Sequence, residues 1–451
     1  MKFVIIGIGK IGETLVEKLS QEKHDVVIVD KNAEVVETLV NKYDVFGVIG
    51  GGADRSSLMD AGVENADFVI ACTSRDELNI LCCILAKKLG AKYTIARVRD
   101  PEYFNEIEYM NSELELDMFF NPERRTAFEI SNILAFPSAT DVERFADGAA
   151  VMIEFRIKPE NPMIGMSIYD VVKKHTVSAL FSMVERGDKV YIPRGDFVIQ
   201  EGDVLHVTAS EEEITKFSKK MQIFRRGAKS VTIIGGGKIG YYLAEELIKK
   251  KISVKIIEKD EDRCMELAGK LPKATIINGD GTDHELLDEM NIEKSNALVA
   301  LTGMDEENVI VSLYAISKKV NKVVSKVDRP TIQQMVKHLG LDTILSPRNA
   351  VADQILKFVR AQEAGGTSGI NQLYKIHDKV EAIEFTLTTD NCDFLGIPLK
   401  ALNMRKNFLV NGIIREGKYI IPTGDTVFQA GDDVLIVTTE KGVRDINAML
   451  K

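Results

Sequence analysis

Two glycine-rich loops are the residues of this chain best suited to bind a phosphate group. Residues 5–12 read IIGIGKIG, and residues 233–240 read IIGGGKIG. In a G-x-G-x-x-G loop after a strand, the first glycine allows a tight turn, the second admits a pyrophosphate against bare backbone, and the third lets helix and strand pack closely. The phosphates then lie at the positive end of the following helix. The spacing predicts nucleotide binding at both loops, with a purely structural glycine turn as the alternative.

An acidic residue follows each loop at the end of the next expected strand. Asp30 and Glu258 are placed to accept hydrogen bonds from the ribose hydroxyls of an adenosine. A carboxylate at this position repels a 2′-phosphate, which favours NAD(H) over NADP(H). Lys31 and Lys259 come next and could weaken that preference, although solvated turn lysines are the favoured interpretation. The predicted contacts of the two loops are Gly7, Ile8, Gly9, Lys10, Ile11 and Gly12, and Gly235, Gly236, Gly237, Lys238, Ile239 and Gly240.

Further polar residues end the expected fourth and fifth strands, at the edge that a dinucleotide would cross. Thr73 and Ser74 end the fourth strand, and Thr302 holds the matching position later in the chain. The alternative for these residues is helix N-capping of the stretches that begin DELN and DEEN. Arg97 ends the fifth strand, where Lys326 is its counterpart. A phosphate partner is the favoured interpretation for Arg97, with a structural or interface ion pair as the alternative.

The elements that position these residues occur twice, because the whole chain is a tandem duplication. The glycines of the two loops are separated by 228 residues, and so are Asp30 and Glu258. Within each copy, short apolar runs alternate with helical patterns, as parallel strands covered on both faces require. The expected strands are 3–6, 26–29, 45–49, 68–71, 93–96 and 117–120 in copy one, and 231–234, 254–257, 275–277, 297–301, 323–327 and 343–345 in copy two.

The sequence pattern changes after Pro137-Ser138 and after residues 361–369. From there on, the expected strands are separated by Gly-Asp turns. The predicted fold class is α/β, with two doubly wound parallel-sheet (Rossmann-like) domains, each followed by a small α+β subdomain. The expected domains are residues 1–139 and 228–365 for nucleotide binding, and residues 140–227 and 366–451 for the small subdomains.

Composition excludes several classes of function. The net charge of -10 argues against nucleic-acid binding, since such a chain repels a phosphate backbone. No apolar run approaches the roughly 20 residues that cross a bilayer, and the N-terminus does not read as a signal peptide, so a cytoplasmic chain is expected. The five cysteines form no C-x-x-C pair, which predicts buried, reduced thiols and no zinc site. The six histidines are scattered, so no catalytic centre and no metal site are predicted.

The order of these motifs resembles the TrkA family of potassium-uptake regulators, which are built from two RCK (regulator of potassium conductance) units. The tandem IIGxGKIG loops, Asp30 and Glu258, the stretches ACTSRDELN and ALTGMDEEN, and the Gly-Asp-rich subdomains carry the resemblance over the full chain. The resemblance implies a cytoplasmic protein, peripheral to the inner face of the cell membrane, that binds NAD(H) or ATP/ADP. It also implies a homo-oligomer, expected to be a tetramer, that regulates a Trk-type membrane subunit for potassium transport.

The two copies depart from the family pattern at two places. The family's Gly-Asp step after strand three, which implies Asp280 as a nucleotide contact, is Gly279-Asp280 in copy two but Gly50-Gly51 in copy one. Lys326 replaces the strand-five arginine in copy two. We therefore expect the two sites to differ in affinity or in preferred nucleotide.

A duplicated nucleotide domain favours sensing over catalysis. A dehydrogenase pairs one glycine loop with a second domain that presents the substrate and a proton-transfer group, whereas here the second domain repeats the first. Two alternatives stay open at this point. One is an NAD-dependent oxidoreductase of a small substrate, and the other is a regulator of a different cation channel or exporter.

Overall fold

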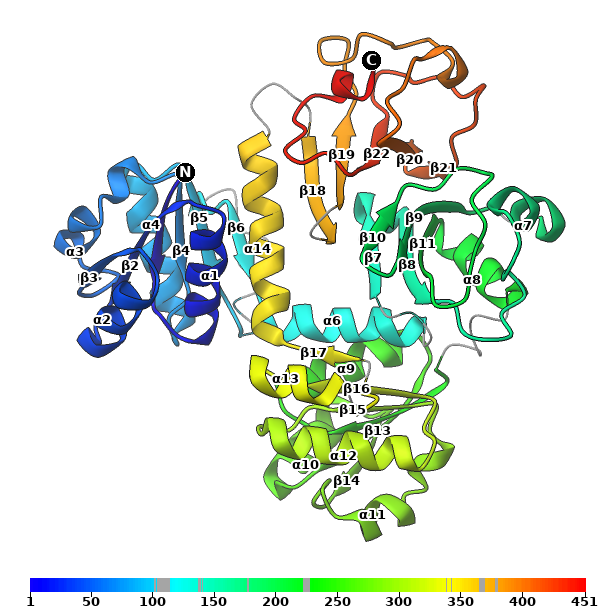
Figure 1. Ribbon diagram of the computed structural model, residues 1–451. Helices are drawn as coiled ribbons and strands as arrows, with labels where there is room; N and C mark the ends of the chain where they lie inside the picture. The colour runs from blue at the N-terminus through cyan, green and yellow to red at the C-terminus, as the bar shows by residue number, and fades with distance from the viewer. Residues whose placement is uncertain are drawn as a thin grey trace. The chain divides into compact units, whose positions relative to one another are not determined.

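The computed structural model describes residues 1–100, 103, 114–136, 139, 141–176, 178–221, 228–337, 339–341, 343–364, 370–377 and 380–451. The chain divides into two compact units, of which the first is Met1–Ile130 with Val231–Gln354 and the second is Ser131–Ser230 with Ile355–Lys451. Each unit thus holds matching parts of both copies (Figure 1). Three predicted domain boundaries lie outside the described residues, near residues 140, 227 and 366. The changes of sequence pattern at 137–138 and 365–369 also lie outside them.

The first unit contains two six-stranded sheets with the same strand order. Copy one has the order β3-β2-β1-β4-β5-β6, and copy two has β14-β13-β12-β15-β16-β17. In copy one the strands are β1 (Lys2–Ile6), β2 (Asp25–Asp30), β3 (Phe46–Ile49), β4 (Phe68–Ala71), β5 (Tyr93–Arg97) and β6 (Met118–Phe120). In copy two they are β12 (Ser230–Ile234), β13 (Ser253–Glu258), β14 (Thr275–Asn278), β15 (Ala297–Ala300), β16 (Lys322–Lys326) and β17 (Ile344–Leu345). The strand pairs of copy one are all parallel, which confirms the doubly wound α/β prediction.

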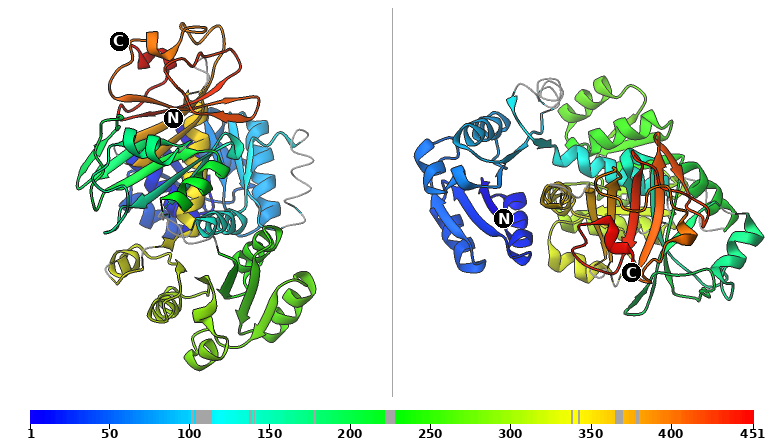
Figure 2. Two further views of the ribbon diagram at one scale, coloured as in Figure 1. Left: turned by 90° about the vertical axis from the view of Figure 1, so that its right-hand side faces the viewer. Right: turned by 90° about the horizontal axis from the view of Figure 1, so that it is seen from above.

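Helices cover both faces of each parallel sheet (Figure 2). Copy one has α1 (Lys10–Gln21), α2 (Ala33–Lys42), α3 (Arg55–Asp60), η1 (Val63–Asn65), α4 (Asp76–Leu89) and α6 (Pro122–Ala135). Copy two has α9 (Lys238–Lys249), α10 (Glu261–Lys270), α11 (His284–Glu289), η3 (Ile292–Lys294), α12 (Asp305–Ser317), α13 (Pro330–Lys337) and α14 (Pro347–Ala364). Apolar residues at helical spacing, such as Leu15 and Leu19 of α1, are fully buried. Burial of these stripes holds each helix on its sheet.

Side-chain caps fix where several of these helices begin. Asn32 accepts a hydrogen bond from the backbone N–H of Glu34 at the start of α2, and Asp54 accepts one from Ser57 at the start of α3. Aspartates cap α10 and α11 in copy two, where Asp260 and Asp283 accept from the first helical turn. Such caps satisfy backbone donors that have no partner inside the helix.

The second unit contains two five-stranded antiparallel sheets, again with matching strand order. One sheet has the order β10-β9-β11-β8-β7, from β7 (Asp141–Phe145), β8 (Ala150–Arg156), β9 (Leu180–Arg186), β10 (Lys189–Tyr191) and β11 (Val204–Ala209). The other has the order β18-β19-β22-β20-β21, from β18 (Ile370–His377), β19 (Val380–Thr386), β20 (Phe408–Arg415), β21 (Lys418–Ile420) and β22 (Asp433–Thr438). Copy one adds η2 (Ala146–Gly148), α7 (Ile168–His175) and α8 (Glu211–Lys220), whereas copy two has η4 (Leu399–Ala401) and η5 (Ile446–Met449). These sheets confirm the prediction of small α+β subdomains.

The Gly-Asp turns of the sequence contain a buried ion pair in each small subdomain. Asp203 is fully buried and accepts hydrogen bonds from Nε and Nη2 of Arg186 at 2.7 and 2.8 Å. Arg415 and Asp432 form the same pair at the same two distances in copy two. Two parallel N–H donors give this contact directional specificity. One Gly-Asp step in each subdomain, Gly202-Asp203 and Gly431-Asp432, therefore supplies the aspartate of an arginine pair.

A shared core and a buried polar network join the two antiparallel sheets of this unit. Phe145, Met152 and Met183 of copy one cluster with Tyr374 and Leu435 of copy two. Ser182 donates to Oδ1 of Asn411 at 2.5 Å, and Nδ2 of Asn411 donates to Oγ1 of Thr208 at 2.9 Å. All three side chains are fully buried, so each needs its partners within the protein.

Replacement of Asn411 by alanine should destabilise the second unit, because Ser182 and Thr208 would each lose a buried partner. The expected cost is about 1–3 kcal/mol, seen as a lower midpoint in urea unfolding of the full chain. Asn65→Ala, at an exposed position of η1, is the control and should change stability by less than about 0.5 kcal/mol. Equal midpoints for the two variants would show that the network contributes nothing.

Candidate functional site

The glycine loop of copy one has a separate structural reason for each of its three glycines. Gly7 adopts a φ of +85°, and a Cβ there would lie 2.7 Å from Thr73. A Cβ on Gly12 would lie 2.6 Å from the carbonyl oxygen of Gly7, so α1 contacts the loop backbone directly. A Cβ on Gly9 would meet nothing within 4 Å, which leaves the start of α1 open on that side. This is the arrangement of a loop that receives a phosphate against its backbone.

Copy two repeats this geometry. Gly235 has a φ of +99°, and a Cβ on Gly240 would lie 2.3 Å from the Gly235 carbonyl oxygen. Gly237 faces open space, as Gly9 does. Lys10 and Lys238 are the first residues of α1 and α9, and the ammonium of Lys10 lies 3.7 Å from the carboxylate of Asp328.

The strand-two acids hold the glycine loops. Oδ2 of Asp30 accepts a hydrogen bond from the N–H of Ile8 at 2.7 Å, and Oδ1 accepts one from Asn32 at 2.9 Å. Glu258 accepts from Gly236 at 2.6 Å and from Asp260 at 2.9 Å. An ionised carboxylate has about four acceptor positions, so each acid keeps capacity for a further donor. The structure thus adds a loop-anchoring role to the ribose contact expected from the sequence.

A buried asparagine fixes the loop after strand four. Oδ1 of Asn79 accepts from both the N–H and the hydroxyl of Thr73, each at 2.7 Å. Nδ2 of the same residue donates to the carbonyl oxygens of Thr73 and Arg97 at 3.2 and 2.9 Å. Asn308 makes the corresponding contacts with Thr302 and Lys326. One side chain therefore ties the ends of strands four and five together in each copy.

The alternative interpretation of Thr73, Ser74 and Thr302 as helix N-caps was wrong. Helix α4 begins at Asp76 with Arg75 at the N-cap position and no side-chain cap, and α12 begins at Asp305 after Met304. The threonines precede these helices by three residues, and their amides bond to the asparagines inside the helices. Hydrogen bonds within the loop after strand four therefore set the positions of the two threonines.

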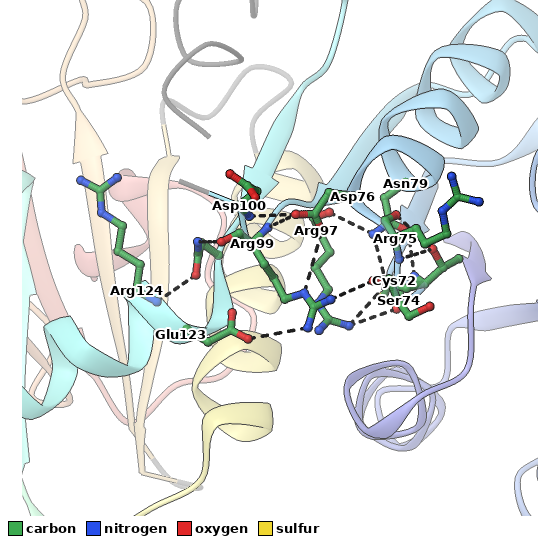
Figure 3. Close-up of polar contacts among 12 residues, drawn as sticks. Cys72, Ser74, Arg75, Asp76, Asn79, Arg97, Arg99, Asp100, Glu123 and Arg124 are labelled. Atoms are coloured by element: carbon green, nitrogen blue, oxygen red, sulfur yellow. Dashed lines mark hydrogen bonds and ion pairs between the residues drawn. The ribbon is translucent and has the colours of Figure 1, made fainter. Parts of the chain in front are cut away.

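Two arginines gather at this edge of copy one (Figure 3). The Nη1 atom of Arg97 lies 3.4 Å from the carbonyl oxygens of Cys72 and Thr73, and its buried Nε has no hydrogen-bond partner. Arg99 donates from Nη2 to the Ser74 carbonyl oxygen at 2.8 Å. Burial, and then the charge of Arg99, lower the pKa of Arg97. An anion at this edge would relieve that repulsion.

Aspartates at the starts of α4 and α12 position the chain after strand five. Oδ2 of Asp76 accepts from the N–H groups of Arg99 and Asp100 at 2.7 and 2.8 Å (Figure 3). Asp305 accepts in the same way from Asp328 and Arg329 at 3.0 and 2.8 Å. The sequence analysis assigned no role to Asp76, Asn79 or Arg99. The signal for Asp76 and Asn79 was the recurrence of Asp and Asn in DELN and DEEN, whereas Arg99 does not recur in copy two.

Copy two differs at the two positions where the sequence departs from the family pattern. Lys326 donates to the Thr302 carbonyl oxygen at 2.6 Å, and burial lowers its pKa. Asp280 pairs with Lys259 at 2.7 Å, and this hydrogen bond lowers the pKa of the carboxyl group. Lys259 is therefore an exposed lysine held by an ion pair. The predicted residues of each copy thus gather at the carboxyl edge of its own parallel sheet.

The cysteines are free and buried. Burial raises the pKa of both Cys72 and Cys82 to about 12. Among the residues that the structure describes, no group of His, Cys, Asp and Glu side chains could hold a metal ion. Within the same residues, no helix combines the length and apolar character needed to span a bilayer.

Comparison with known proteins adds independent evidence. Residues 3–122 and 231–347 match the TrkA-N domain, and residues 152–222 and 383–451 match the TrkA-C domain. The Trk system potassium uptake protein TrkA homolog 1 of Methanosarcina mazei is 34% identical over 460 residues, with 100% of both chains covered. The chain belongs to the TrkA family.

Solved structures share the fold of this TrkA-family chain. The GsuK channel bound to NAD superposes with a TM-score of 0.65 at 18% identity, covering 98% of this chain and 77% of the channel chain. GsuK bound to ADP gives a TM-score of 0.51 at 16% identity, covering 80% and 69%. The TM-scores show a common fold, and at these identities the ligand of the TrkA-family chain is inferred from its own residues.

Replacing Gly12 by alanine should destabilise the first unit, because its Cβ would press on the Gly7 carbonyl oxygen and separate α1 from β1. The expected loss is about 1–3 kcal/mol, as for other overpacked positions, measured by thermal or urea unfolding. Gly9→Ala is the matched control, since its Cβ meets open space and should leave the unfolding midpoint nearly unchanged. If both variants unfold at the wild-type midpoint, the close helix-to-loop contact is unimportant for stability.

Proposed function

We propose that the chain is a cytoplasmic nucleotide-sensing subunit that regulates potassium uptake through a membrane transporter. The observation that carries the proposal is the duplicated site in a TrkA-family chain. Each copy has an open glycine loop, a carboxylate that anchors it, and an asparagine-locked strand end. Two matched candidate sites in one chain suit a protein whose response depends on occupancy rather than turnover.

The residues at each edge fit an adenine dinucleotide or an adenosine phosphate. The loop N–H groups and the first turns of α1 and α9 would hold phosphates, and Asp30 and Glu258 would hold ribose hydroxyls. In copy one, Thr73, Ser74 and Arg97 complete the proposed contacts, and in copy two Asp280 and Thr302 do so. The NAD-bound and ADP-bound GsuK structures have the same fold, which supports NAD(H) with ATP or ADP as the ligand class.

Regulation requires that the occupied and empty states differ in how the units pack. A ligand shifts such an equilibrium only by its difference in affinity between the two states. Closed rings are the usual outcome when repeated units associate, and a tandem chain supplies part of each contact covalently. We therefore propose a homotetramer, bound to the inner face of the cell membrane through a potassium-transporting partner of the Trk type.

Adenine nucleotides should stabilise the chain without being consumed. At about 100-fold over the dissociation constant, ligand binding adds about 2.7 kcal/mol to the free energy of unfolding. Gly9→Ala should weaken binding at site one, and Gly237→Ala at site two, because each new Cβ occupies the open side of its loop. Calorimetric titration with NADH and with ATP measures both effects, and absorbance at the same time detects any NADH oxidation. No binding by the wild type at millimolar nucleotide would reject the site, and steady NADH turnover would favour an oxidoreductase.

The double variant Asp30→Asn with Glu258→Gln should abolish nucleotide-dependent potassium flux in vesicles that contain the membrane partner. Each substitution removes a charge from both the loop anchor and the ribose contact, worth about 1.5–3 kcal/mol per charge-assisted hydrogen bond. The matched control is Glu17→Gln with Glu245→Gln, which removes the same charge from equivalent positions of α1 and α9. Light scattering should show a tetramer for the wild type and both variants. A monomer at micromolar concentration, or flux that ignores nucleotide, would contradict the proposed regulation.

A further inference from the structure

A cavity of about 300 Å³ lies within the first unit, apart from the glycine loops. This volume is at the lower end of the range for small-molecule sites. Its lining combines aromatic, cationic and other polar side chains from β6 and α6 of copy one with single residues of α9 and α14. The lining residues used below are Phe119, Arg124, Arg125, Phe128, Glu246 and Gln354.

The cationic side of the cavity comes from the first turns of α6. Arg124 extends from α6 away from the cluster of Arg97 and Arg99 (Figure 3). The guanidinium of Arg125 lies 5.9 Å from the ring centre of Phe128, and its Nε donates to Glu129 at 3.0 Å. A guanidinium beside an aromatic face can bind a planar anionic group through its remaining N–H donors.

The lining also includes acceptors. Oε1 of Gln354 is buried and accepts no hydrogen bond, and Glu246 on α9 accepts from Lys249 at 3.1 Å. A buried amide oxygen without a donor costs free energy, which a ligand or a water molecule in the cavity would recover. The lining of the cavity thus combines guanidinium donors, an acceptor without a hydrogen-bond partner, and phenylalanine rings.

The duplication supplies a comparison for this cavity. Alignment of α6 with α14 matches Phe128 to Asp353, and alignment of α1 with α9 matches Lys18 to Glu246. In that equivalent place, the ammonium of Lys18 lies 2.5 Å from Oδ1 of Asp353. Arg124 and Arg125 correspond there to Asn349 and Ala350. One of the two equivalent places is therefore bridged by an ion pair, and the other is an open cavity with two arginines.

We propose that this cavity is a second ligand site, separate from the nucleotide sites, for a small organic carboxylate with an aromatic or apolar body. The carboxylate pairs with the guanidinium groups of Arg124 and Arg125, and the body lies against Phe119 and Phe128. A hydroxyl or amino group on the ligand can donate to Gln354. The proposal stands on the lining alone and does not depend on the nucleotide function.

The test uses 3-phenylpropionate as the probe, with 3-phenylpropanol as its neutral analogue and propionate as its truncated analogue. Ligand-observed saturation-transfer NMR on the full-length protein should show 3-phenylpropionate binding in the millimolar range or tighter. The neutral alcohol should bind at least about tenfold more weakly, because it lacks the charge-assisted contact. Propionate should also bind more weakly, because it lacks the ring.

The variant Phe128→Asp with Glu246→Lys transplants the ion pair of the equivalent place into the cavity and should abolish probe binding. Arg124→Gln with Arg125→Gln should weaken it at least about tenfold. Lys18→Ala, which breaks only the other ion pair, should bind the probe like the wild type. Calorimetric titration with NADH and thermal unfolding monitor the folding of each variant. If a variant fails to fold, binding of the three probes to the wild type still tests the proposal. No wild-type binding at about 10 mM probe, equal binding of the alcohol, or unchanged binding by the folded transplant variant would overturn the proposal.

Discussion

A hydrogen bond between a strand-end carboxylate and a loop amide sets the geometry on which the rest of each parallel-sheet domain depends. Asp30 accepts from Ile8 at 2.7 Å, and Glu258 accepts from Gly236 at 2.6 Å. These bonds hold the first turn of the loop over strand two, so the following helix starts at a fixed place against strand one. In the proposed function the same carboxylates contact the ribose, so the group that orders the loop also sets the charge that the nucleotide meets.

Interactions that position the backbone recur in both copies, whereas the side chains around the two glycine loops differ between the copies. The Asn79 and Asn308 locks, the Asp76 and Asp305 anchors, and the arginine pairs of the small subdomains recur with nearly the same distances. Each is buried or partly buried, where an unpaired polar group is costly. The side chains around the two glycine loops differ in charge, as shown by Gly51, whose counterpart in copy two is Asp280. Duplication has thus preserved the scaffold and allowed the binding surfaces to change separately.

The sequence predicted correctly the features of the fold that local sequence patterns determine. Apolar runs and glycine spacing located the strands of the parallel sheets within one or two residues, and the repeat identified matching sites. It failed where a contact joins residues that lie apart along the chain. The role of Thr73 depends on Asn79, which reaches back from inside α4, and a threonine shortly before a helix reads equally well as a cap. The cavity could not be predicted, because α6 and α9 are more than a hundred residues apart in the chain.

The burial of the cysteines has a consequence for how the chain responds to oxidants. Burial raises the pKa of the thiols of Cys72 and Cys82 to about 12, so at pH 7 these groups are in the thiol form. Oxidation to sulfenic acid and disulfide exchange both proceed through the thiolate, so they are slow at these two positions. Cys72 directly precedes the strand-end loop of site one, yet burial makes its thiol unreactive. Peroxide is therefore expected to oxidise either thiol only slowly, including the one that directly precedes the strand-end loop of copy one.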